Sequence, residues 1–113
     1  MSKRIFLSPP WLGGSERARV EEAFASGYIA PCGPMVDRFE RAFAGRTGIA
    51  HTCALSSGSA ALDLLFHELG IGPGDRVFCS DLTFISSIAS AVQRGAEPVF
   101  IDCDEASWTM DPD

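Results

Sequence analysis

A short polar turn, Ser56-Ser57-Gly58-Ser59, is the first place in this sequence where the residue types suggest chemistry. It leaves an apolar segment and opens an alanine-rich helix that is predicted to end at Gly70. The first backbone N–H groups of a helix have no partner within the helix, so they attract anions. Gly58 would let the backbone approach an anion, and Ser57 and Ser59 could add hydroxyl donors. The turn therefore predicts either a phosphate-binding site or, more simply, a serine cap on the helix.

An aromatic side chain follows the next predicted strand, at the edge of the sheet where ligands of open α/β sheets bind. Phe84 comes shortly after the apolar strand Arg76–Cys79. Its ring could stack on a flat ligand, and an ordinary core phenylalanine is the alternative. A phosphate-binding turn beside such a ring indicates a planar phosphorylated cofactor. The turn has neither the GxGxxG nor the GxxxxGK[ST] pattern, which argues against dinucleotide and P-loop sites.

The elements expected to position these residues alternate between strands and helices. Strands are predicted over 49–55, 76–79 and 98–102, with helices between them. Short connections in the order β-α-β-α-β predict a parallel sheet and an α/β fold class. Two further helices, over 16–26 with Ser15 as N-cap and over 35–46, precede the first strand as a helical arm.

Composition excludes several classes of protein. The 113 residues carry nine Lys plus Arg against fifteen Asp plus Glu, a net charge of −6, so no basic stripe is available for nucleic acid. No apolar run approaches the ~20 residues of a membrane span. The segment Met1–Phe6 lacks the apolar core of a signal peptide. We therefore expect a soluble cytoplasmic protein with no nucleic-acid or membrane partner.

The four cysteines are widely spaced and show no metal-ligand pattern. There is no CxxC and no Cys/His spacing typical of zinc, so neither a metal site nor a disulfide framework is predicted. Most lie in apolar segments, where cysteine behaves as a small hydrophobe. We expect all four to be reduced core residues: Cys32, Cys53, Cys79 and Cys103.

Eight short motifs occur along the chain and together form a specific set. They are Leu7-Ser8-Pro9-Pro10, Gly14-Ser15-Glu16, Ile29-Ala30-Pro31-Cys32-Gly33-Pro34, Phe39-Glu40, Ser56-Ser57-Gly58-Ser59-Ala60-Ala61-Leu62, Gly74-Asp75, Leu82-Thr83-Phe84-Ile85 and Gly95-Ala96-Glu97-Pro98-Val99-Phe100-Ile101-Asp102. In this order, from Ile5 to Asp111, the sequence resembles the N-terminal part of the DegT/DnrJ/EryC1/StrS sugar aminotransferases, a family of pyridoxal-phosphate enzymes.

The resemblance implies the large domain of a fold type I aminotransferase, homodimeric when full length. Such enzymes convert a nucleotide-linked keto sugar to an amino sugar, usually with glutamate as amino donor, in polysaccharide or glycan biosynthesis. Residues 1–48 would be an extended segment with a two-helix arm, and residues 49–113 an incomplete cofactor-binding domain.

The resemblance also implies roles for individual residues. The phosphate of pyridoxal 5'-phosphate would be held by Gly58 and Ser59, with Ser57 a weaker third, although threonine is usual at position 59. Phe84 would stack on the pyridine ring. The loop 28–34, with Tyr28 and Pro31, would lie near the sugar nucleotide.

No catalytic residue is expected within this chain. The family needs a Schiff-base lysine and an acidic partner for the pyridine nitrogen, both downstream of Asp113. The chain has a single lysine, Lys3, far from the strand ends. We therefore expect an N-terminal fragment that does not transaminate alone. The alternative is a non-catalytic phosphate-binding remnant, or an interaction module that pairs with a separate second half.

Overall fold

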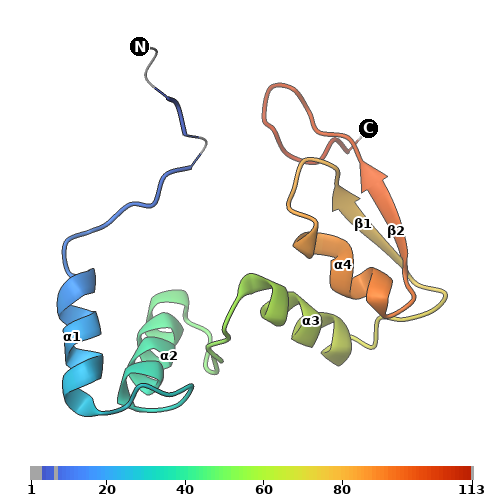
Figure 1. Ribbon diagram of the computed structural model, residues 1–113. Helices are drawn as coiled ribbons and strands as arrows, with labels where there is room; N and C mark the ends of the chain where they lie inside the picture. Colours follow the sequence, from blue (N-terminus) through green and yellow to red (C-terminus); the bar gives the residue numbers. More distant parts are fainter. Residues whose placement is uncertain (1–3, 7, 113) are drawn as a thin grey trace. The chain divides into compact units, whose positions relative to one another are not determined.

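The structure is a computed structural model that describes residues 4–6 and 8–112 (Figure 1). Lys3 and Leu7, which entered the sequence analysis, lie outside these residues. No helix in the described ranges combines the length and apolarity that a membrane span requires. The elements, in chain order, are the helices α1 (Glu16–Ser26), α2 (Pro34–Thr47) and α3 (Gly58–Glu68), strand β1 (Arg76–Ser80), helix α4 (Ser86–Gln93) and strand β2 (Glu97–Ile101).

The chain divides into two compact units, Met1–Ala54 with α1 and α2, and Leu55–Asp113 with the remaining elements. The domain division after residue 48 that the sequence suggested stays a prediction. The predicted helix over 16–26 matches α1, and the other three predicted helices begin or end within a few residues of α2, α3 and α4.

The start of α1 differs from the prediction in its capping group. Ser15 occupies the N-cap position, but its side chain makes no capping hydrogen bond. Instead the Glu16 carboxylate accepts hydrogen bonds from the N–H groups of Gly13 (2.6 Å) and Gly14 (2.8 Å). Backbone hydrogen bonds from Glu16 itself and from Gly13 hold the pKa of Glu16 below its usual value. A carboxylate at a helix N-terminus also interacts favourably with the helix dipole.

Neither α1 nor α2 contains a buried residue. Several large apolar side chains of these helices are exposed, including Phe24 (66%) and Phe39 (57%). The rings of Phe39 and Phe43, one helical turn apart on α2, contact each other with centroids 6.0 Å apart. In the described residues this unit therefore has no fully buried apolar core.

The strand predicted over 49–55 is not formed. A strand needs a neighbouring backbone to satisfy its N–H and C=O groups. The segment is instead bonded to α2, because Thr52 Oγ1 donates to the Glu40 carbonyl (2.7 Å) and the Ala54 N–H donates to the Glu40 carboxylate (2.8 Å). In the described residues the sheet thus has two strands, and the order from α3 onward is α-β-α-β.

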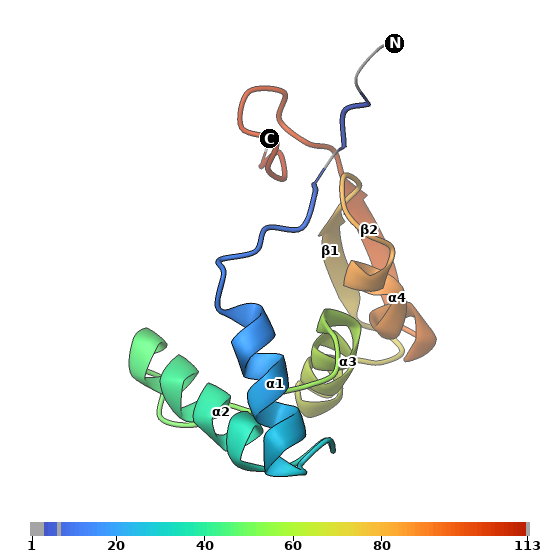
Figure 2. The ribbon, with the colours of Figure 1, turned by 60° about the vertical axis from the view of Figure 1, so that its left-hand side comes forward.

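The second unit is built on the parallel pair β1 and β2, joined through α4 (Figures 1 and 2). Arg76 pairs with Glu97 and Ser80 with Ile101, so the two strands are in register along their full length. α4 packs on both strands and on α3. In both views α3 and α4 begin on the side where the strands end, so their N-termini point toward the carboxyl edge of the sheet.

A small apolar core lies between α3, α4 and β1. Ile88 is almost completely buried, and fully burying such a side chain stabilises a fold by about 1.5–3 kcal/mol. The buried side chains are Phe66, Cys79, Ile88, Ala91 and Ala96, with Leu62, Ile71 and Val77 packed against them.

The expectation that all four cysteines are core residues is only partly right. All four are free thiols, and Cys79 is buried in the core. Cys32 and Cys53 are exposed, and Cys103 is half-buried. Cys32 and Cys53 lie in irregular segments of the first unit, where no packed layer of the described chain covers them. An apolar neighbourhood in sequence therefore did not produce burial.

Candidate functional site

Ser57 is the N-cap of α3, as the simpler of the two sequence interpretations held. Its backbone is extended (φ −162°), and its Oγ accepts a hydrogen bond from the Ala60 N–H at 3.1 Å. Its carbonyl oxygen accepts from the Ala61 N–H, also at 3.1 Å. Ser57 therefore accepts hydrogen bonds from the third and fourth N–H groups of the helix. Its hydroxyl is already engaged as an acceptor, which leaves the first two N–H groups for another partner.

The N–H groups of Gly58 and Ser59 have no hydrogen-bond acceptor among the described residues. The space where a Cβ of Gly58 would sit is also open, with no atom within 4 Å. The first turn of α3 carries no acidic side chain that would repel an anion. Two unpaired donors, the positive end of the helix dipole and open space above a glycine suit a phosphate group.

Phe84 lies in the connection from β1 to α4, and its backbone is held in place. The Asp81 N–H donates to the Ile101 carbonyl (3.0 Å), which continues the strand pairing, and the Ser87 N–H donates to the Phe84 carbonyl (2.9 Å). Phe84 is 83% exposed. The alternative that Phe84 is a core residue is therefore wrong for the described chain, and its side chain is open to solvent.

The structure brings the two halves of the predicted site into one unit. Gly58 and Ser59 begin α3, and Phe84 lies just before α4. Both helices begin toward the carboxyl ends of the strands (Figures 1 and 2). This is the edge at which α/β sheets bind ligands. The residues present thus fit a ligand that has both a phosphate group and a flat ring.

Tyr28 and Pro31 belong to the other unit, in the loop between α1 and α2. Gly33 in this loop has φ 134°, and a Cβ there would lie 3.0 Å from the Tyr28 ring. Tyr28 lines a cavity of about 270 Å³, whereas Pro31 is exposed and is not among the lining residues. The cavity lining is largely apolar and consists of Ala23, Tyr28, Ile29, Ala30, Cys32, Gly33, Met35 and Val36.

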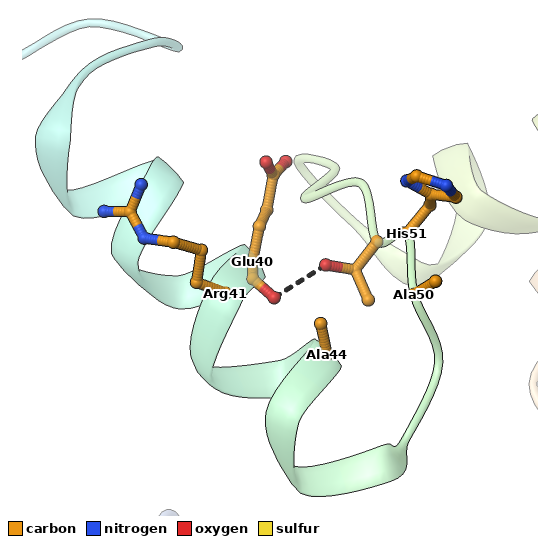
Figure 3. Close-up of a pocket in the computed structure, with 6 residues that line it drawn as sticks. Glu40, Arg41, Ala44, Ala50 and His51 are labelled. Carbon is orange, nitrogen blue, oxygen red and sulfur yellow. Dashed lines mark hydrogen bonds between the residues drawn. The ribbon is translucent and has the colours of Figure 1, made fainter.

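A second cavity of the first unit, about 200 Å³, lies between α2 and the segment that follows it (Figure 3). Figure 3 shows Arg41 and His51 on opposite sides of Glu40. The Glu40 carbonyl oxygen accepts the hydrogen bond from Thr52 Oγ1. Because the charged groups do not converge on one point, the arrangement does not resemble a catalytic site. Sequence reasoning assigned no role to Glu40, whose two hydrogen bonds hold the 52–54 segment.

One group of possible metal ligands occurs in the described part of the chain. Ligand atoms of Asp81, Asp102 and Cys103 lie within 4.8 Å of one another. Both aspartates are exposed, and the Asp102 carboxylate accepts from the Cys103 N–H at 2.7 Å. The sequence-based expectation that the chain has no metal ligand stays a prediction.

Comparison with known proteins matches the family that the motifs suggested. The model of the DegT/DnrJ/EryC1/StrS aminotransferase family matches residues 10–113. The chain belongs to this family, and its α/β architecture is the N-terminal part of the fold type I aminotransferase large domain.

Individual relatives agree with this assignment. The chain is 42% identical over 112 residues to EpsN of Bacillus subtilis, whose name assigns it provisionally to the pyridoxal phosphate-dependent aminotransferases. It is 39% identical over 108 residues to the GDP-perosamine synthase of Caulobacter vibrioides. These matches cover 99% and 96% of the chain.

Among solved structures, the chain matches Spr1654 from Streptococcus pneumoniae in its PLP form, a protein provisionally named a sugar aminotransferase. The TM-score is 0.79 at 33% identity, over 96% of the chain. The chain spans 29% of the length of EpsN and of the GDP-perosamine synthase, and 28% of Spr1654.

Proposed function

We propose that this chain forms the phosphate- and ring-binding part of a pyridoxal 5'-phosphate-dependent sugar aminotransferase. The observation that carries the proposal is the pair of unpaired N–H groups at Gly58 and Ser59, in the same unit as the exposed ring of Phe84. Membership of the family supports the choice of cofactor.

In this proposal the chain's own residues bind and orient. The Gly58 and Ser59 N–H groups and the Ser59 hydroxyl donate to the phosphate, and the open side of Gly58 permits close approach of its oxygens. Ser57 contributes mainly by fixing the helix start, because its Oγ already accepts from Ala60. Phe84 covers one face of the ring. The bound cofactor supplies the electron sink that amino transfer needs.

The proposed substrate is a nucleotide-linked keto sugar, with glutamate as amino donor and polysaccharide or glycan biosynthesis as the setting. The relative named GDP-perosamine synthase supports a nucleotide-linked sugar. Tyr28 and Pro31 would lie near this substrate, and the full-length enzyme would be a cytoplasmic homodimer.

The chain by itself would bind the cofactor without catalysing amino transfer, since its single lysine is Lys3. The test titrates the full chain with pyridoxal phosphate, follows the absorbance of the cofactor, and then adds borohydride to trap any lysine adduct. We expect saturable binding that inorganic phosphate reverses, with no specific adduct and no amino transfer from glutamate. A specific adduct together with turnover would overturn the expectation that the chain alone does not catalyse amino transfer. Absence of saturable binding would overturn the proposed cofactor site.

The exposed sheet favours a second candidate, a non-catalytic module that pairs with a separate second half. Phe78 points to the face of β1 opposite the buried Cys79 and is 62% exposed, so apolar surface is open to a partner. The DNA downstream of Asp113 separates the candidates. Coding sequence that continues in frame to an acidic strand end and a lysine-bearing loop would favour the first candidate, and a separate reading frame encoding them would favour the module that pairs with a second half. Absence of both would favour a phosphate-binding remnant.

A further inference from the structure

Arg94 connects the end of α4 to the side of α3. It is the C-cap residue of α4, and its side chain is 25% exposed. Its Nη2 donates to the Asp63 carboxylate (2.9 Å) and to the Asp63 carbonyl (3.1 Å). Its Nη1 lies 3.3 Å from His67 Nδ1. One guanidinium therefore contacts two successive turns of the helix that begins with the proposed phosphate site.

The chemistry of this contact is specific to arginine. A guanidinium has donors only, so His67 Nδ1 must be the acceptor, which requires a neutral imidazole with its hydrogen on Nε2. The planar guanidinium presents several donors in a fixed arrangement, whereas a lysine ammonium is a point charge on a flexible stem. The Arg94 Nε is buried with no partner among the described residues. Burying this N–H donor without an acceptor costs folding free energy, which the three contacts to α3 offset.

Asp63 is also the first acidic residue of α3 after the proposed phosphate site. It lies five positions after Gly58, about 7.5 Å along the helix axis. This rise along the axis is comparable to the screening length of about 8 Å at physiological ionic strength, so an unpaired carboxylate here would oppose a phosphate through a partly screened interaction. Its ion pair with Arg94 reduces that repulsion. The same contact thus holds α3 on α4 and lowers the negative potential at the start of α3.

We propose that Arg94 is a positioning residue for the phosphate site: through Asp63 and His67 it holds α3 against α4, and it neutralises the first carboxylate of the helix that begins with Gly58 and Ser59. This inference rests on the proposed function. It adds a residue outside the proposed contacts to the phosphate and the ring, and outside the motifs that carry the family resemblance.

The test measures the phosphate preference of the full chain, defined as the Kd for pyridoxal divided by the Kd for pyridoxal phosphate. A residue that only stabilised the fold would change both constants together and leave this ratio unaltered. Replacing Arg94→Gln should lower the ratio by about two- to fivefold, the size of one charge interaction at a helix end. The matched control is Arg76→Gln, which removes the same charge from an exposed ion pair with Glu97 in the same unit and should leave the ratio unchanged.

The outcomes distinguish a failure of the proposed function from a failure of the proposed role of Arg94. A wild-type ratio of one would overturn the proposed function itself. A wild-type ratio above one that Arg94→Gln leaves unaltered would overturn only the role of Arg94. If Arg94→Gln loses its helical circular dichroism, Arg94→Lys decides the positioning role, because it keeps the charge and loses the planar fork: a ratio below wild type supports positioning by the guanidinium, and the wild-type ratio overturns it. Amide chemical shifts of Gly58 and Ser59 on titration with inorganic phosphate provide an independent readout, and we expect smaller changes in Arg94→Gln.

Discussion

Arg38 and Glu22 lie sixteen residues apart in sequence and form a two-point ion pair that joins α2 to α1. Arg38 Nη1 donates to Glu22 Oε1 at 2.8 Å, and Nη2 donates to Oε2 at 3.0 Å. Arg19 on α1 donates to the same carboxylate at 3.0 Å. In a unit whose helices bury no residue, this arrangement is the most specific contact between them. The hydrogen bond from Arg38, and then that from Arg19, lower the pKa of Glu22 to about 2.

The ion pair predicts how the stability of the first unit depends on pH. The folded pKa of Glu22 is about 2, below its ordinary value of 4.5, so the contribution is complete above pH 4.5 and is lost as the pH falls toward 2. Thermal melts of wild type and Glu22→Gln, followed by circular dichroism from pH 7 to 2, should converge over this window. The matched control is Glu21→Gln, whose carboxylate pairs with Arg17 on the same helix. An equal gap between wild type and Glu22→Gln at every pH would contradict the prediction.

Two glycines of the first unit, Gly33 before α2 and Gly45 inside it, should respond in opposite ways to substitution by alanine. Gly33→Ala should destabilise the chain by about 1–3 kcal/mol, because φ is 134° and the new methyl would meet the Tyr28 ring at 3.0 Å. Gly45→Ala, inside α2 with no atom within 4 Å, should stabilise it by about 0.5–1 kcal/mol. Urea denaturation measures both changes. A stabilised Gly33→Ala would contradict the packing of Tyr28 on Gly33, and a destabilised Gly45→Ala would contradict the open space at Gly45.

The two serines at the start of α3 should separate stability from binding. Ser57→Ala removes the cap on the Ala60 N–H and should cost about 1 kcal/mol of folding free energy. Ser59→Ala removes a hydroxyl that has no partner among the described residues, so stability should change by less than about 0.5 kcal/mol. Ser59→Ala should nevertheless weaken pyridoxal phosphate binding, measured by absorbance titration. Unchanged affinity would remove Ser59 from the site.

Phe84 should likewise affect binding without affecting the fold. Its ring is 83% exposed, so Phe84→Ala should change the free energy of unfolding by less than about 0.5 kcal/mol. Loss of stacking should weaken pyridoxal phosphate binding by about two- to tenfold. Ile88→Ala, four residues further along the chain and in the core, should instead cost about 2–5 kcal/mol. A large stability loss in Phe84→Ala would mean that the ring is packed in solution.

Local features were the most predictable part of the fold. Gly27 and Gly48 end α1 and α2 in left-handed conformations (φ 73° and 75°), which glycine adopts most readily. The predicted strands 76–79 and 98–102 coincide closely with β1 and β2. Such features depend on a few neighbouring residues, so sequence pattern is sufficient to find them.

The sequence by itself determined the family, the helix limits and the residues Gly58, Ser59 and Phe84 as candidates, because motif order and local backbone preferences are properties of the chain. Only the tertiary structure decided what depends on partners distant in sequence. It left 49–55 without a strand, because no neighbouring strand pairs with it in the described residues. It placed Phe84 at the surface and joined Arg94 to Asp63 across thirty-one positions, a contact that exists only because α4 packs on α3.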